Sequence, residues 1–148
     1  MGEICLDDNY DLRLLSLGAG VQSTCVYLMC LEDEFEDVPT QAVFADTHWE
    51  PDEVYEHLDR LEALGRGKIP IHRVSAGNLR QDVLDALDKR KSRIGQPPFY
   101  VKNLDTQEGM DKDDGGMLWR ICTKEYKIEP IQKEIRRLLG YRKGQRIQ

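Results

Sequence analysis

The chain has 148 residues, of which 40% are hydrophobic and 32% are charged. This length suits one domain over residues 1–148, and the composition excludes a disordered tail, a collagen-like repeat and a membrane protein. No apolar run approaches the roughly 18 residues of a membrane span. Met1–Asp11 has neither the basic nor the apolar region of a signal peptide. The sequence therefore predicts a cytoplasmic protein without membrane contact.

Charge is unevenly distributed along the chain, whose formal net charge is -6. The segment from Trp119 to Gln148 holds 9 of the 21 basic residues and only 3 of the 27 acidic residues. Such a cationic segment is typical of a contact with an anion or a nucleic acid, and equally of a solvated helix with Lys and Arg near its C-terminal end. Nucleic acid is therefore one class of partner that the sequence allows.

Three short apolar runs end in turn-forming residues, and a segment with helical spacing follows each of them. Strands are predicted at 12–15, 41–45 and 69–74, and helices at 21–31, 51–65 and 78–87. The first helix should bury an apolar face of four residues, Val21, Cys25, Leu28 and Met29. Cys25 and Cys30 are expected to be small core residues. Pro51 suits the start of the second helix, and Asn78 suits the N-cap of the third.

Beyond the third helix, the sequence predicts a long loop from Arg93 to Gly116, with Phe99–Val101 as a candidate short strand. Two further helical segments are expected at 118–126 and 128–139. Because three strand–helix units favour a parallel sheet with right-handed crossovers, we expect a doubly wound, Rossmann-like α/β fold. Ligands of such sheets bind beyond the carboxyl ends of the strands.

The first predicted strand runs into a turn of small and hydroxyl-bearing residues, from Ser16 to Thr24. Small residues let the backbone approach a phosphate closely, and free N–H groups at a helix N-terminus attract its charge. The turn lacks the lysine of a Walker loop and the spacing of the dinucleotide fingerprint. Taken alone, it predicts either a phosphate-binding loop or a tight strand–helix turn.

Three segments carry features of known motifs, in the same order along the chain. Gly18–Ser23 is similar to a Ser-Gly-Gly-X-Asp-Ser loop, and Phe44–Thr47 followed by Pro51–Glu53 is similar to an Asp-Thr step before an acidic helix start. Arg120–Ile131 is similar to a cysteine-containing Lys-Val-X-Pro-Leu segment. Together they resemble the phosphoadenosine phosphosulfate (PAPS) reductase family, which lies within the adenine nucleotide alpha-hydrolase superfamily, also called the PP-loop or N-type ATP pyrophosphatase superfamily. The resemblance runs from about Leu12 to Leu139.

This resemblance implies that the first loop holds the phosphates of ATP or a related adenine nucleotide, with magnesium. The loop residues concerned are Ser16, Gly18, Ala19, Gly20, Val21, Gln22, Ser23 and Thr24. It also implies that the backbone around Phe44 to Asp46 contacts the adenosine. Asp46 is a candidate contact for the ribose or for a metal-bound phosphate, and Thr47 lies beside it in the same motif.

The resemblance also implies functional residues in the cationic segment from Trp119 to Gln148. Arg120, Lys124 and Lys127 are candidate anion contacts, since Arg in particular suits bidentate binding of phosphate or sulfate. Cys122, Arg120 and Lys127 are the candidate catalytic residues. Cys122, flanked by basic residues, is a candidate nucleophile, and it equally suits the role of a buried small residue.

Several departures from the family pattern reduce the range of reactions and cofactors that the resemblance implies. Gly18 stands where the loop usually has Ser, and Gln22 stands where it usually has Asp, which removes a carboxylate. Cys122 is followed by Thr123 rather than by a second cysteine, so no iron–sulfur cluster is expected. The sequence also has no cysteine near its C-terminus of the kind that the reductases use.

We therefore predict an ATP-pyrophosphatase-type enzyme that adenylates a substrate and releases pyrophosphate. The alternatives are a non-catalytic nucleotide-sensing or assembly module with the same fold and, less favoured, a sulfonucleotide reductase with Cys122 as its nucleophile. Family members continue with a strand beside the first one, so we expect a sheet truncated at its C-terminal strands. The apolar edge that this leaves predicts a homo-oligomer or a partner chain.

Overall fold

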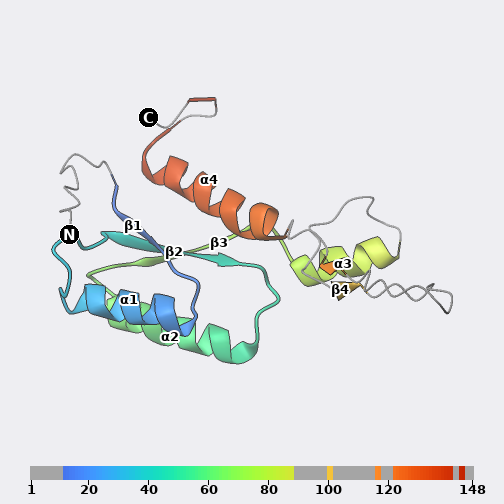
Figure 1. Ribbon diagram of the computed structural model, residues 1–148. Helices are drawn as coiled ribbons and strands as arrows, with labels where there is room; N and C mark the ends of the chain where they lie inside the picture. The colour runs from blue at the N-terminus through green and yellow to red at the C-terminus, as the bar shows by residue number, and fades with distance from the viewer. Residues whose placement is uncertain (1–11, 89–99, 102–115, 118–121, 142–143, 146–148) are drawn as a thin grey trace. The chain divides into compact units, whose positions relative to one another are not determined.

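The computed structural model describes residues 12–88, 100–101, 116–117, 122–141 and 144–145, and it is an α/β structure with a three-stranded parallel sheet (Figure 1). Its elements run in the order β1 (Leu14–Ser16), α1 (Val21–Leu31), β2 (Gln41–Asp46), α2 (Asp52–Gly65), β3 (Ile71–Ser75), α3 (Leu79–Leu87), β4 (Tyr100–Val101), β5 (Gly116–Met117), η1 (Thr123–Ile128) and α4 (Glu129–Leu138). The chain divides into two compact units. The sheet unit comprises Met1–Ala45, Glu50–Val74 and Ile131–Gln148, and the turn unit comprises Asp46–Trp49 and Ser75–Pro130.

The three predicted strands form one sheet in the order β1-β2-β3. Leu15 pairs with Ala42, and the Leu17 N–H donates to the Val43 carbonyl at 2.8 Å. β3 begins at Ile71, two residues later than predicted. Pro70 has no N–H to add to a ladder, although its carbonyl accepts a hydrogen bond from the Ala42 N–H at 2.9 Å.

Among the described residues, β1 has a strand neighbour on one side only. The Arg13 carbonyl accepts a hydrogen bond from the Thr40 N–H, and the Leu17 N–H donates to the Val43 carbonyl. The backbone N–H and C=O groups of the odd-numbered residues in this segment therefore point toward β2. Because successive residues of a strand alternate, the backbone groups of Leu14 and Ser16 face the other way. A mostly apolar cavity of about 400 Å³ opens beside this strand. It is lined by Arg13, Leu14, Leu15, Val26, Cys30, Phe35, Asp37 and Pro39.

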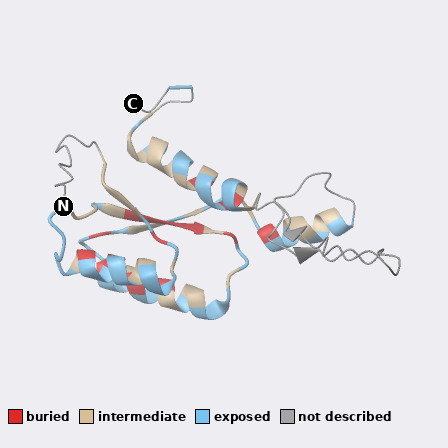
Figure 2. Cartoon of the chain, in the orientation of Figure 1, coloured by how far each residue is buried: buried red, intermediate tan, exposed pale blue. Residues whose placement is uncertain are grey.

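The sheet is covered on both faces within the sheet unit. Figure 1 shows α1 and α2 on one face and the main part of α4 on the other. The core lies between the sheet and α1 and α2, where Figure 2 shows buried residues along β2 and the inner sides of the helices. It consists of Leu17, Tyr27, Cys30, Ala42, Phe44, Leu58, Leu61 and Ile69.

Tyr27 and Gly65 make the tightest contact in this core. Tyr27 is fully buried, and its hydroxyl donates to the Ile69 carbonyl at 2.7 Å. A Cβ on Gly65 would lie 1.7 Å from the Tyr27 hydroxyl oxygen, so only glycine fits there without rearrangement. The glycine that was predicted to end α2 therefore also makes room for a buried ring.

The buried face of α1 differs from the predicted one. Val21 is 88% exposed, Leu28 and Met29 are also exposed, and Cys25 is an exposed free thiol. The buried residues are Tyr27 and Cys30, so the core assignment is wrong for Cys25 and confirmed for Cys30. Since α1 is apolar on nearly every side, the spacing of its apolar residues does not select which side faces the sheet.

The turn unit carries α3, and Asn78 caps this helix as predicted, because its side chain accepts from the Gln81 N–H at 2.9 Å. Only Leu79 of α3 is buried, and Leu87, an apolar residue at the end of this helix, is 74% exposed. β4 confirms the candidate strand over Tyr100–Val101, and it pairs antiparallel with β5 at the end of the predicted loop. Further along, η1 is a π-helix that runs directly into α4. The prediction of two separate helices, at 118–126 and 128–139, is therefore wrong, because the helix has no break near Lys127. No helix in the described ranges combines the length and apolarity needed to cross a bilayer.

Candidate functional site

The loop between β1 and α1 belongs to the sheet unit and is anchored by a buried side chain. Leu17 is 2% exposed and lies in the core, whereas its neighbours Ser16 and Gly18 are exposed. Ala19 has a positive φ of 54°, so it is this residue, not a glycine, that takes the left-handed conformation. Gly20 follows as the N-cap of α1 with an extended backbone.

The first turn of α1 presents its backbone donors without a side-chain cap. Gly20 has no side chain to accept from them, and a Cβ placed on Gly20 would meet no atom within 4 Å. Val21 and Gln22 are exposed beside it. The helix start therefore offers N–H groups and the positive end of a helix dipole at an open surface, which suits an anion.

The two hydroxyls of this turn already have partners within the protein. Ser23 Oγ donates to the Gly20 carbonyl at 3.1 Å. Thr24 Oγ1 lies 2.9 Å from His57 Nε2, a part-buried hydrogen bond that joins α1 to α2. The backbone of the loop is therefore more available to a ligand than its hydroxyls. Sequence reasoning missed His57, because no local pattern connects residues that lie 33 positions apart.

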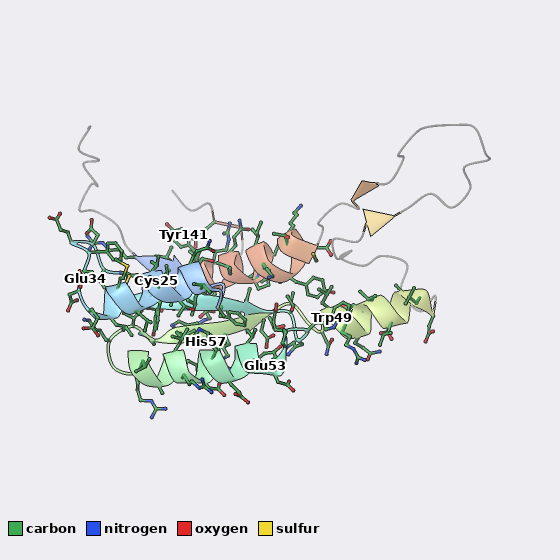
Figure 3. The ribbon with its side chains drawn as sticks, turned by 60° about the horizontal axis from the view of Figure 1, so that its bottom comes forward. Cys25, Glu34, Trp49, Glu53, His57 and Tyr141 are labelled. Carbon is green, nitrogen blue, oxygen red and sulfur yellow. The ribbon has the colours of Figure 1, made fainter. Side chains whose placement is uncertain are left out.

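A shallow, mostly apolar cavity of about 450 Å³ runs between α1 and α2 next to this loop. It is lined by Ala19, Val21, Thr24, Cys25, Leu28 and His57. Figure 3 marks Cys25 on α1 and His57 on α2. Apart from the Thr24–His57 pair and the Cys25 thiol, its lining offers no polar side chain to orient a ligand.

The turn that follows β2 belongs to the turn unit and contains two of the predicted site residues. Asp46 is the last residue of β2, and its Oδ1 accepts from the His48 N–H at 2.7 Å. Thr47 is 4% exposed, and its carbonyl accepts from the Leu79 N–H at 2.9 Å. Trp49 is 43% exposed (Figure 3). Phe44, two residues before Asp46, has its ring in the core, so only its backbone is left for the predicted adenosine contact.

The candidates of the cationic segment are only partly described. Arg120 lies outside the described residues. Cys122 is a half-buried free thiol just before η1, and Lys127 is exposed on η1. Both belong to the turn unit, as Asp46 and Thr47 do, whereas the β1–α1 loop belongs to the sheet unit.

Two basic residues of α4 are held by internal partners. Arg137 donates twice to Glu134, at 2.8 and 2.6 Å, and Arg136 Nη1 donates to the Gln145 carbonyl at 2.7 Å. The hydrogen bonds from Arg137 lower the pKa of Glu134 below its usual value. His72 on β3 adds to this cluster, because its Nδ1 lies 3.3 Å from Glu134 Oε1.

One buried pair holds α3 to η1 within the turn unit. The Tyr126 hydroxyl donates to Asp82 Oδ2, and Tyr126 is 5% exposed. Burial is the main reason why the pKa of Tyr126 is well above its usual range, and the adjacent Asp82 carboxylate raises it further. Tyr126 therefore serves as a hydrogen-bond donor and not as an acid near neutral pH.

Metal-ligating side chains do not gather in the part of the chain that the structure describes, since no three His, Cys, Asp or Glu residues converge there. The described residues thus include an uncapped helix start at α1, which is a candidate anion site, and an Asp–His turn after β2. Comparison of the chain with protein-family models, with curated proteins and with solved structures finds no match.

Proposed function

We propose that the chain is an adenine-nucleotide-binding domain of the PP-loop ATP-pyrophosphatase type, with a doubly wound α/β fold. In this proposal ATP adenylates an acceptor and pyrophosphate leaves. The motif resemblance supplies the identity of the nucleotide, and the β1–α1 loop supplies the physical reason why it would bind.

The observation that carries the proposal is the start of α1. No atom lies within 4 Å of where a Cβ on Gly20 would stand, and no side chain caps the first-turn N–H groups. Phosphate oxygens are strong acceptors, and charge-assisted hydrogen bonds from N–H groups to them are about twice as strong as neutral ones. The same donors would stabilise the charge that develops on departing pyrophosphate.

The described residues fit a nucleotide phosphate better than they fit a magnesium ion. Gln22 replaces the loop carboxylate, and one oxygen of Asp46 accepts from the His48 backbone. Magnesium prefers carboxylates together with phosphate oxygens. We therefore assign no step to a protein-held metal.

Gln22 favours a second candidate function, a domain that binds adenine nucleotide without turning it over. It is exposed in the first turn of α1 and carries no charge. This candidate shares the phosphate loop with the first, and it differs in predicting no release of pyrophosphate.

The test is calorimetric titration with ATP, AMP and PAPS, comparing wild type with Gly20→Val. Because Gly20 has ordinary dihedral angles and open space, the valine should leave folding unchanged and block the approach of phosphate. Loss of one or more charged hydrogen bonds, at roughly 1.5–3 kcal/mol each, weakens ATP binding by at least about tenfold.

Ala63→Val is the matched control, because it places the same isopropyl group on an exposed position of α2. It should bind ATP as the wild type does. If wild type binds none of the three nucleotides, or if Gly20→Val binds them equally well, the phosphate-loop proposal fails. PAPS binding tighter than ATP would shift the function toward sulfonucleotide chemistry.

A further inference from the structure

The cavity between α1 and α2 lies wholly within the sheet unit and meets the β1–α1 loop. Its volume of about 450 Å³ is in the range of roughly 300–1,000 Å³ that small-molecule sites occupy. Two of its lining residues, Ala19 and Val21, stand on either side of Gly20, the N-cap of α1. A ligand in this cavity would therefore lie next to the uncapped N–H groups of the helix start.

The wall of this cavity suits an uncharged, apolar group. The lining residues that the structure describes include no Asp, Glu, Lys or Arg, and α1 itself carries no charged side chain. Val21 is 88% exposed, and Leu28 is 38% exposed. Exposed apolar side chains that gather at a cavity are typical of a ligand-binding groove, because a ligand that covers them removes apolar surface from water.

One polar pair interrupts the apolar wall. His57 reaches from α2 toward α1, where its Nε2 lies 2.9 Å from Thr24 Oγ1 (Figure 3). A hydroxyl and a neutral imidazole carry one hydrogen-bonding proton each. The bond between them uses one of these protons, whichever tautomer the ring adopts, so the other is left to donate elsewhere. The pair can therefore offer a ligand one donor together with at least one acceptor.

We propose that this cavity holds the adenine ring of the nucleotide whose phosphates lie at the start of α1, an inference that rests on the proposed function. Adenine is flat and uncharged, and one edge presents its amino donor beside a ring-nitrogen acceptor. Val21 and Leu28 contact the ring, and the Thr24–His57 pair forms hydrogen bonds with its edge. The same groove thus continues from the phosphate-binding N–H groups to the site of the base.

This placement differs from the one that the resemblance implies, in which the adenosine contacts the backbone around Phe44 to Asp46. The Phe44 ring is buried in the core, so it leaves no apolar side chain there for the base. The cavity supplies apolar side chains, and all of its lining residues belong to the sheet unit. The two placements of the ring can therefore be told apart by a probe inside the cavity.

The exposed thiol of Cys25 is such a probe, because Cys25 lines this cavity. The experiment measures the rate at which iodoacetamide alkylates Cys25 in wild type, with peptide mapping to separate it from the other cysteines. Adenosine and ATP, each at about ten times its Kd, should slow this alkylation about tenfold by occupying the cavity. Inorganic triphosphate, which carries the phosphates without the ring, should bind at the start of α1 and leave the rate unchanged.

Matched variants test the same cavity by calorimetry. Cys25→Trp fills the cavity, so it should lose adenosine binding and keep the binding of inorganic triphosphate. Val26→Trp is the control, since Val26 lines the cavity beside β1 instead, and it should bind both ligands as wild type does. His57→Phe keeps a flat ring but removes its hydrogen-bonding atoms, and it should weaken adenosine binding roughly two- to tenfold.

The outcomes separate this inference from the proposed function. Wild type that binds neither ATP nor inorganic triphosphate overturns both. ATP that binds and leaves the alkylation of Cys25 unchanged overturns the ring site and leaves the phosphate loop standing, as does equal adenosine binding by Cys25→Trp and Val26→Trp. Equal adenosine binding by His57→Phe and wild type overturns the role assigned to the polar pair.

Discussion

The sheet unit and the turn unit are stabilised in different ways. The sheet unit buries a continuous apolar cluster that includes fully buried Tyr27 and Leu58. The described part of the turn unit buries few side chains, among them Leu79 and Tyr126, and relies on specific hydrogen bonds. Apolar burial is non-directional, whereas hydrogen bonds fix orientation. The difference suggests that the first unit supplies stability and the second holds polar groups in place.

The strongest way to test this contrast is Leu58→Ala in the sheet unit. Leu58 is fully buried, so the truncation removes transfer free energy and leaves a cavity. We expect a loss of roughly 2–5 kcal/mol in the free energy of unfolding, measured by urea titration. Leu64→Ala, on the same helix but 63% exposed, should change it by less than about 0.5 kcal/mol. Equal effects at the two sites would contradict the burial argument.

A second test adds volume to the same core. Gly65→Ala brings a Cβ within 1.7 Å of the Tyr27 hydroxyl oxygen, so the ring or the helix must shift. We expect a loss of roughly 1–3 kcal/mol. Adding Tyr27→Phe should recover part of it, because it removes the nearest clashing atom and leaves only Cζ, at 2.9 Å, in close contact. Gly20→Ala, where the new Cβ meets nothing, is the matched control. A Gly65→Ala protein as stable as wild type would show that the core rearranges around the added Cβ at little cost in free energy.

A third test addresses the turn unit with Tyr126→Phe. The change deletes the hydrogen bond to Asp82, and we expect a loss of roughly 0.5–1.5 kcal/mol at neutral pH. Because the pKa of Tyr126 is raised in the folded state, that state holds the phenol proton more tightly than the unfolded state does. Wild type should therefore lose stability as the pH rises above the ordinary tyrosine value of 10.0, and the variant should lose less. Parallel stability curves for the two proteins would contradict this.

The smallest effect is expected at Glu134→Gln on α4. The pKa of Glu134 is lowered by hydrogen bonds from Arg137, so its contribution is present above the ordinary glutamate value of 4.5 and is lost as the pH falls. Chemical denaturation from neutral to acidic pH should show wild type losing stability faster than the variant. Arg137 is 63% exposed, so solvent screening keeps the difference small. An identical acid dependence would mean that the cluster adds nothing.

The strands could be predicted because apolar runs that stop abruptly leave a clear signal. Ala42–Ala45 is buried throughout and Asp46 ends the run, as expected of a strand covered on both faces. The Asn78 cap was predictable for a similar reason, since its side chain acts on a residue three positions away. The buried face of α1 was not, because a helix that is apolar on most sides could pack in several rotations.

The candidate site was less predictable than the fold. The glycine-rich turn predicts a phosphate-binding loop, which stays a prediction. The positive φ values of Ala19 and His48 could not be predicted, because neither residue is a glycine. The Thr24–His57 contact joins two helices far apart in sequence, so it emerges only from packing. The π-helical backbone of η1 leaves no mark in residue spacing that differs clearly from an α-helix.

The two cysteines of α1 can report how often the core opens, because one is exposed and the other is buried. Cys25 is exposed, whereas Cys30, five positions on, is 2% exposed, and burial raises the pKa of its thiol. A thiol reagent should therefore label Cys25 at once and reach Cys30 only when α1 separates from the sheet. The lag between the labelling of Cys25 and that of Cys30 would report how often that separation occurs, with peptide mapping to tell these two thiols from Cys5 and Cys122.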